Sequence, residues 1–190
     1  MGYAIAEAAI EAGHDVVLIS GPTALTPPPS ARTIKIATSD ELCAAVHAQV
    51  EDCDVLVMCA AVADYKPATP STQKMEKHDA PFALPLLPTR DILASLAHKN
   101  RGYFVVGFAA QTHDLEANAL RKLHAKNCDM MVANDISRTD SGMESDDNEV
   151  TIFFRERESK TISRASKKII AREILKIVFE MCEKSLTKKT

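Results

Sequence analysis

The stretch that decides the fold runs from residue 103 to residue 134 and reads YFVVGFAAQTHDLEANALRKLHAKNCDMMVAN. Two nearly continuous apolar runs, 103–109 and 128–134, flank a polar segment with helical periodicity at 113–126. A run that is apolar at almost every position is typical of a strand buried on both faces of a parallel sheet. The stretch therefore predicts a β-α-β unit, in which a helix connects two parallel strands.

The same alternation of strands and helices extends to both sides of this unit. Further strands are predicted at 15–20 (DVVLIS), 33–37, 54–60 (DVLVMCA) and, as a small edge hairpin, at 149–154 and 160–162. Further helices are predicted at 3–12, at 39–50 with Ser39 as the N-cap, at 91–99 and at 166–185. Together they predict an α/β fold: a three-layer, Rossmann-like, mostly parallel sheet with helices on both faces and a small edge hairpin.

The length and composition of the chain narrow its class. A chain of 190 residues fits a single domain at 1–190. A formal net charge of −3 argues against a general nucleic-acid binder, which carries a strongly basic face. No apolar run approaches the roughly 20 residues of a membrane span, and five cysteines without a C-x-x-C pair favour reduced thiols over disulfides or zinc. We expect a cytoplasmic protein with neither a membrane nor a nucleic-acid partner.

A proline-rich segment interrupts the alternation at about 66–90. It carries five prolines, too many for one regular element, and we interpret it as a flap on the single domain. A second irregular stretch, 137–148, is polar and acidic and is typical of a surface loop. The flap contains Lys74 and Lys77, so it brings positive charge to whatever it covers.

The carboxyl ends of the predicted strands are the first place to search for a ligand site, because ligands of open α/β sheets bind there. The segments that leave these ends are 20–22, 60–64, 108–111 and 133–135, and most contain small residues that let a ligand approach the backbone. Asp64 leaves a buried strand at such an end. It either faces a cation or polar ligand there or only caps a turn, and both interpretations stay open.

Two lysines on the predicted 113–126 helix form the second candidate. Lys122 and Lys126 are four positions apart, so they share one helix face and repel each other slightly. An anionic ligand such as a triphosphate would turn that repulsion into attraction, whereas the alternative is a solvated face. Neither a G-x-G-x-x-G motif nor a Walker A motif is present, so dinucleotide or P-loop binding is unsupported.

Seven segments together resemble one known family. They are SGPTALTPPP (20–29), CAAVADYKP (59–67), QKMEK (73–77), RDILASL (90–96), VGFAAQT (106–112), KLHAKNCDMMVANDIS (122–137) and SKKIIAREIL (166–175). Their order and spacing resemble bacterial phosphopantothenoylcysteine synthetase, also called phosphopantothenate–cysteine ligase. This family is usually the C-terminal half of a bifunctional coenzyme A biosynthesis protein. The resemblance extends from residue 2 to about residue 175.

The resemblance implies a CTP-dependent ligase with 4'-phosphopantothenate, CTP and cysteine as its partners. Such enzymes activate the carboxylate of 4'-phosphopantothenate as an acyl-cytidylate, and cysteine then displaces CMP. Mg²⁺ is the expected cofactor, although no metal ligand is assigned. Family members are homodimers in which the flap crosses the active site, so residues 66–90 would be a lid.

The resemblance also implies a set of site residues. Lys74 is implied to be catalytic and to reach the phosphates, and the family match favours CTP binding over a solvated face for the two helical lysines. The implied nucleotide-binding residues are Met58, Cys59, Ala60, Asp64, Lys74, Arg90, Asp91, Ile92, Leu93, Phe108, Lys122 and Lys126. The first three of these, and residues 90–93, would line the nucleotide through their backbone.

The sequence departs from the family pattern in three places. Gln111 stands where the family has an acid, and Thr89-Arg90 stands where Asn-Pro is common. The family also begins with a strand, a G-G-T turn and a loop ending S-S-G-K-M-G, of which Met1-Gly2 is present here. That segment supplies the family's first strand and a catalytic asparagine. Two alternatives follow: a non-catalytic nucleotide-binding remnant that needs the missing segment, or an ATP-using relative.

Overall fold

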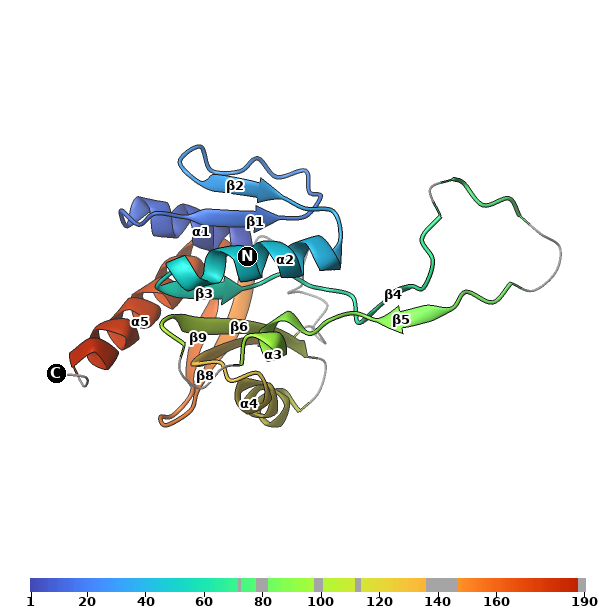
Figure 1. Cartoon of the computed structure of the whole chain (residues 1–190). Coiled ribbons are helices and arrows are strands. Elements are labelled where there is room, and N and C mark those ends of the chain that lie inside the picture. The colour runs from blue at the N-terminus through green and yellow to red at the C-terminus, as the bar shows by residue number, and fades with distance from the viewer. Residues whose placement is uncertain (72, 78–81, 98–100, 112–113, 136–146, 188–190) are drawn as a thin grey trace.

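The computed structural model describes residues 1–190 except 72, 78–81, 98–100, 112–113, 136–146 and 188–190 (Figure 1). The elements in chain order are α1 (Gly2–Glu11), β1 (Val17–Ser20), β2 (Arg32–Lys35), α2 (Ser39–Gln49), a 3-10 turn (Val50–Asp52), β3 (Val55–Met58), β4 (Tyr65–Pro67), β5 (Leu86–Pro88), α3 (Ile92–Ser95), β6 (Phe104–Gln111), α4 (Leu115–Ala125), β7 (Met130–Asp135), β8 (Asp147–Phe154), β9 (Lys160–Ser166) and α5 (Lys167–Thr187).

A five-stranded sheet with the strand order β3-β6-β7-β8-β9 forms the centre of the molecule. Strands β3, β6 and β7 are parallel, whereas β8 and β9 form an antiparallel hairpin at the edge. The predicted β-α-β unit is β6-α4-β7, and it lies at the heart of this sheet. Strands β1 and β2 form a separate parallel pair. The predicted α/β class and the edge hairpin are confirmed, and both hairpin strands extend beyond their predicted bounds.

Helices cover both faces of the sheet, which gives three layers. On one face, Leu42 of α2, Ile92 of α3 and Leu123 of α4 belong to one buried apolar cluster. On the other face, α1 and α5 pack together and against the sheet, with Ile5 and Ile174 in the buried clusters there. Among the described residues, no helix combines the length and the apolar character that crossing a membrane requires.

Local chemistry sets two helix ends differently from the prediction. The N-cap of α2 is Thr38 and not Ser39, because Thr38 and Glu41 form a reciprocal capping box. Helix α3 has four residues, shorter than the predicted 91–99. The Ser95 hydroxyl donates back to the carbonyl of Ile92, a bond that competes with continued helix formation.

The chain between β4 and β5 leaves the body of the molecule as a long projection (Figure 1). We call residues 65–88 the arm. Strands β4 and β5 pair antiparallel at its base, so the proline-rich stretch begins and ends in short strands. Apolar side chains along the arm are exposed, including Tyr65, Phe82 and Leu86. Lys66 joins the base of the arm to the first turn of α2 through an ion pair with Asp40.

Candidate functional site

Strand β3 ends beside the middle of its longer neighbour β6. Met58, the last residue of β3, is in register with Gly107, and β6 continues for four more residues to Gln111. The segment that leaves β3 therefore starts beside the backbone of β6. Gly2 at the start of α1 also approaches it, because a Cβ at that glycine would lie 3.7 Å from the Cβ of Cys59. The structure thus places Met58 at the end of β3 and Cys59 directly after it, and Phe108 follows Gly107 on the neighbouring β6.

Hydrogen bonds tie the segment after β3 to the segment before α3. The backbone N–H of Thr89 donates to the carbonyl of Asp64 at 2.9 Å, and the Thr89 hydroxyl donates to the carbonyl of Ala63 at 2.6 Å. Asp64 therefore lies opposite Thr89, which is two residues before Asp91 in the chain. These bonds hold the end of the predicted segment 60–64 beside the start of the predicted segment 90–93.

Helix α4 supplies the cations that face these two segments. Leu123 is fully buried against the sheet, which fixes the rotation of the helix. Lys122 lies in the last turn and Lys126 is the C-cap, where the negative end of the helix dipole favours cations. The four-residue spacing puts both on one side of the helix.

Charged groups of opposite sign meet at this point. The Asp91 carboxylate lies 3.4 Å from the Lys126 ammonium, in a partly exposed ion pair. Burial lowers the pKa of Lys122, and the nearby charges of Lys126 and Arg121 lower this pKa further, whereas Asp64 raises it. Two lysines and two carboxylates thus gather between the end of α4 and the segments that follow β3 and precede α3. Such a cluster can hold a polyanion whose charge the lysines offset.

Ile92 and Leu93, which belong to the predicted site residues, contribute no side chain to the charged cluster. Ile92 and Leu93 are 4% and 7% exposed, so their side chains belong to the core of the same face as α4. A ligand contact of these two residues would therefore have to come from their backbone, which is the kind of contact that the resemblance implies. Burial also raises the pKa of the Cys59 thiol, which keeps this thiol protonated near neutral pH.

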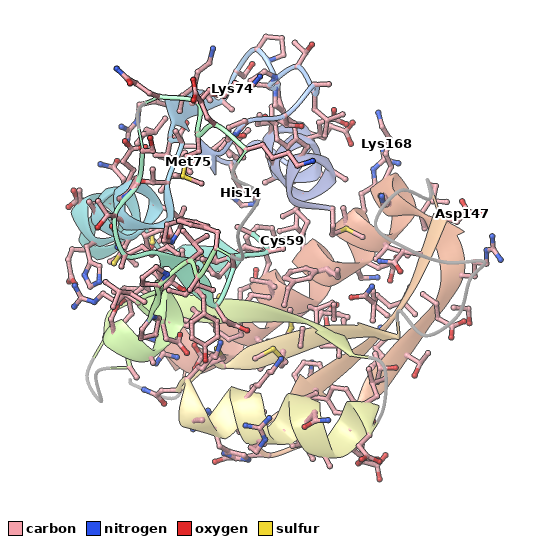
Figure 2. The ribbon with its side chains drawn as sticks, turned by 90° about the vertical axis from the view of Figure 1, so that its right-hand side faces the viewer. His14, Cys59, Lys74, Met75, Asp147 and Lys168 are labelled. Carbon is pink, nitrogen blue, oxygen red and sulfur yellow. The ribbon has the colours of Figure 1, made fainter. Side chains whose placement is uncertain are left out.

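Phe108 and Lys74 are not brought to this cluster. Phe108 packs against the apolar clusters of α1 and α5, on the face of the sheet opposite α4. Lys74 is exposed on the arm, and Figure 2 shows it at the top of the view, whereas α4 lies at the bottom. Within one chain, the described residues place neither of these side chains beside Lys122 and Lys126.

The Asp91–Lys126 ion pair is the feature that sequence reasoning missed. The resemblance implied only a backbone contact for Asp91, but its side chain both caps α3 and contacts Lys126. An aspartate directly before the apolar residues Ile92 and Leu93 is the local signal of an N-cap. That signal predicts the cap, but it contains nothing about the lysine.

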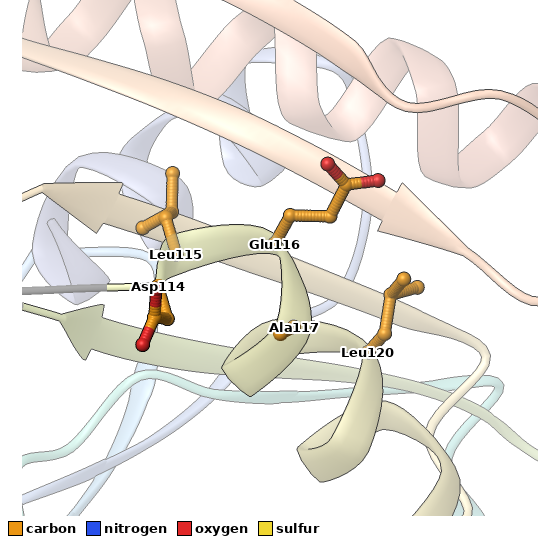
Figure 3. Close-up of a pocket in the computed structure, with 5 residues that line it drawn as sticks. All are labelled: Asp114, Leu115, Glu116, Ala117 and Leu120. Atoms are coloured by element: carbon orange, nitrogen blue, oxygen red, sulfur yellow. The ribbon is translucent and has the colours of Figure 1, made fainter.

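A surface hollow lies at the opposite end of α4. It is lined by Asp114, Leu115, Glu116, Ala117 and Leu120 (Figure 3). None of the predicted site residues lines it. The described residues also contain no cluster of three or more His, Cys, Asp or Glu side chains that could hold a metal.

Comparison with known proteins decides the family. A model of the DNA/pantothenate metabolism flavoprotein C-terminal domain matches residues 1–181. The chain belongs to this family. The coenzyme A biosynthesis bifunctional protein CoaBC of Vibrio vulnificus is 42% identical over 180 residues, which are 93% of this chain and 44% of that protein. The chain thus spans less than half of this curated relative, and the family predicted from the motifs is confirmed.

Solved structures agree with the family domain. The crystal structure of the C-terminal domain of CoaBC superposes with a TM-score of 0.80 at 36% identity and covers 96% of this chain and 82% of that chain. A Cab2 mutant in complex with phosphopantothenate-cysteine superposes with a TM-score of 0.77 at 15% identity, covering 99% of this chain and 79% of that one. At that identity the likeness concerns the fold alone.

Proposed function

We propose that the chain is a phosphopantothenate–cysteine ligase that uses CTP. In the first step, a carboxylate oxygen of 4'-phosphopantothenate attacks the α-phosphorus of CTP, which forms an acyl-cytidylate and releases pyrophosphate. In the second step, the amine of cysteine attacks the acyl carbon, loses a proton and expels CMP. The product is an amide, and the energy of the triphosphate has been used to activate a carboxylate.

The charge cluster on α4 is the observation that carries this proposal. A carboxylate that attacks a phosphate brings two anions together, so cations must offset their repulsion. Lys126 pairs with Asp91, and Lys122 interacts with the charge of Asp64, on segments that leave the carboxyl end of β3 and precede α3. Ligands of this class of sheet bind at such ends. The backbone of 58–60 and 90–93 supplies neighbouring polar groups. In this proposal Asp64 contacts the nucleotide as well, and Phe108, which packs on the face of the sheet opposite α4, contacts a part of the nucleotide away from the phosphates.

Mg²⁺ fits this site as an ion carried by the phosphates. Mg²⁺ in such sites keeps several waters and takes only one or two carboxylates together with phosphate oxygens. Asp64 is exposed at the site and fits that role, since its carboxylate is close enough to act on the charge of Lys122. Mg²⁺ would supply charge neutralisation of the triphosphate.

A homodimer with the arm as a lid completes the proposal. Six large apolar side chains of the arm are between 49% and 64% exposed: Tyr65, Met75, Phe82, Leu84, Leu86 and Leu87. Exposed apolar surface of this extent indicates a protein contact, and a second copy of the chain is the partner we propose. In that dimer Lys74 would reach the phosphates in the partner's site. The five cysteines are free, in keeping with the reducing cytoplasm in which we place the reaction.

Pyrophosphate release tests the proposed activity. We expect the chain to release pyrophosphate from CTP only with 4'-phosphopantothenate present, and to form the amide only when cysteine is added. ATP in place of CTP tests the choice of base. CTP binding without pyrophosphate release under any of these conditions would instead make the chain a nucleotide-binding module.

Lysine substitutions test the assignment of the site. We expect Lys122→Met and Lys126→Met each to weaken CTP binding by about 1–3 kcal/mol, because each removes a charged hydrogen bond to phosphate. Lys168→Met is the matched control, since Lys168 is an exposed α5 residue paired with Glu7. Because the pKa of Lys122 is lowered, its share of the affinity is lost, as pH rises, at a less alkaline pH than for an ordinary lysine. Calorimetry that shows unchanged affinity in both variants contradicts the assignment.

A further inference from the structure

The two carboxylate oxygens of Asp91 have different partners. Oδ1 accepts the backbone N–H of Ala94 at 3.0 Å and caps α3. Oδ2 lies 3.4 Å from Nζ of Lys126. Capping requires one acceptor oxygen, which the side chains of asparagine and serine also provide. The ion pair with Lys126 is therefore separable from the cap, because a neutral capping residue removes one and keeps the other.

Asp91 pairs with the ammonium group of Lys126, which is the group that binds phosphate in the proposed function. Lys126 carries one compact positive charge, which the Asp91 carboxylate partly offsets. A phosphate that approaches Lys126 also approaches Asp91 and meets its negative charge. The side chains of Lys126 and Asp91 are 30% and 49% exposed, so neither partner is locked in place by burial and exchange of one anion for another is accessible.

We propose that the carboxylate of Asp91 is an internal counter-ion that competes with nucleotide phosphate for Lys126. This inference rests on the proposed function, in which Lys126 contacts phosphate. Asp91 is a positioning residue that acts through Lys126. Its carboxylate lowers the affinity for the triphosphate and re-forms the ion pair when the anionic products leave. An interaction that holds substrate and products equally lowers KM without raising kcat. Weaker binding of the triphosphate through Asp91 therefore raises KM and does not slow the chemical step.

The test measures CTP affinity by calorimetry in neutral capping variants. We expect Asp91→Asn and Asp91→Ser to tighten CTP binding by about three- to five-fold at low ionic strength, the scale of one exposed ion pair. The gain shrinks at high ionic strength. Cytidine, which has no phosphate, binds all variants equally. Glu11→Gln removes a comparable carboxylate, paired with Arg172 on the outer helices, and leaves CTP affinity unchanged. In steady state, the KM for CTP falls in the Asp91 variants and kcat does not rise.

A second background separates this inference from the proposed function. In a Lys126→Met chain, Asp91→Asn is expected to tighten CTP binding clearly less than in the wild type, because the lysine for which carboxylate and phosphate compete is absent. If Lys126→Met weakens CTP binding but Asp91→Asn and Asp91→Ser do not tighten it, the counter-ion role is overturned while the lysine assignment stands. If Lys126→Met leaves CTP affinity unchanged, the lysine assignment itself fails and the counter-ion role fails with it. The midpoint of thermal unfolding is expected to stay close to that of the wild type in Asp91→Asn and Asp91→Ser, because both side chains can still cap α3.

Discussion

Leu123 of α4 and Leu86 of the arm are the same residue type in opposite surroundings. Leu123 is completely buried, whereas Leu86 is 53% exposed. The body of the molecule places most of its large apolar residues in clusters between the helices and the sheet, and the arm leaves its own in contact with solvent. The difference teaches that the apolar residues of the arm contribute little to the fold of one chain. They are available for contact with a partner.

Ion pairs show the same contrast. In the body, the Arg101 guanidinium and the Asp129 carboxylate lie 2.5 Å apart, and the same carboxylate oxygen accepts the backbone N–H of Val105 at 2.7 Å. At the base of the arm, the pair of Lys66 with Asp40 is exposed on both sides. The first pair links the starts of β6 and β7, and the second joins surface groups.

The largest expected effect separates the two leucines. Leu123→Ala is expected to lower the free energy of unfolding by about 2–5 kcal/mol, because it leaves a cavity in the core. Leu86→Ala is expected to change it by no more than about 0.5 kcal/mol, since its side chain is already solvated. Urea unfolding of both variants at low protein concentration checks this. Equal losses would remove the distinction between body and arm.

An intermediate effect is expected for the two ion pairs. Asp129→Ala is expected to cost about 2–3 kcal/mol, because it leaves Nη2 of Arg101 and the N–H of Val105 without their acceptor. Asp40→Ala is the arm-side counterpart, and its loss is expected to stay below about 1 kcal/mol. The same unfolding measurement applies. A larger loss for Asp40→Ala would show that the base of the arm is part of the cooperative fold.

The smallest expected effect concerns self-association. Phe82 is 64% exposed on the arm, and Phe82→Ser is expected to weaken the proposed dimer by about ten-fold, or about 1.4 kcal/mol, while the fold persists. Sedimentation of the wild type and the variant over a concentration series checks this. Ile169→Ser is the control, because Ile169 is an exposed apolar residue of α5. Equal weakening by both substitutions would argue that the arm has no special part in association.

The site was predictable where the signal was local. The apolar run of β3 and the small residues after it predicted a ligand edge, and the spacing of Lys122 and Lys126 predicted a shared helix face. The prediction could not reveal that Phe108 packs on the opposite face from these lysines. Strand alternation places Phe108 on one face, but only the packing of α1 and α5 decides which face that is.

Apart from the short strands β4 and β5, which the proline-rich stretch did not reveal, the sequence by itself determined the order of the elements and the class of the fold. Burial on both faces leaves a continuous apolar run in each parallel strand, and helices leave their own period, so both are written locally. Only the tertiary structure decided that Asp91 meets Lys126. That contact depends on how α3 and α4 pack against the same sheet, and no pattern around either residue encodes the distance between them. The structure likewise decided that the arm leaves its apolar residues exposed, because burial is a property of the whole fold.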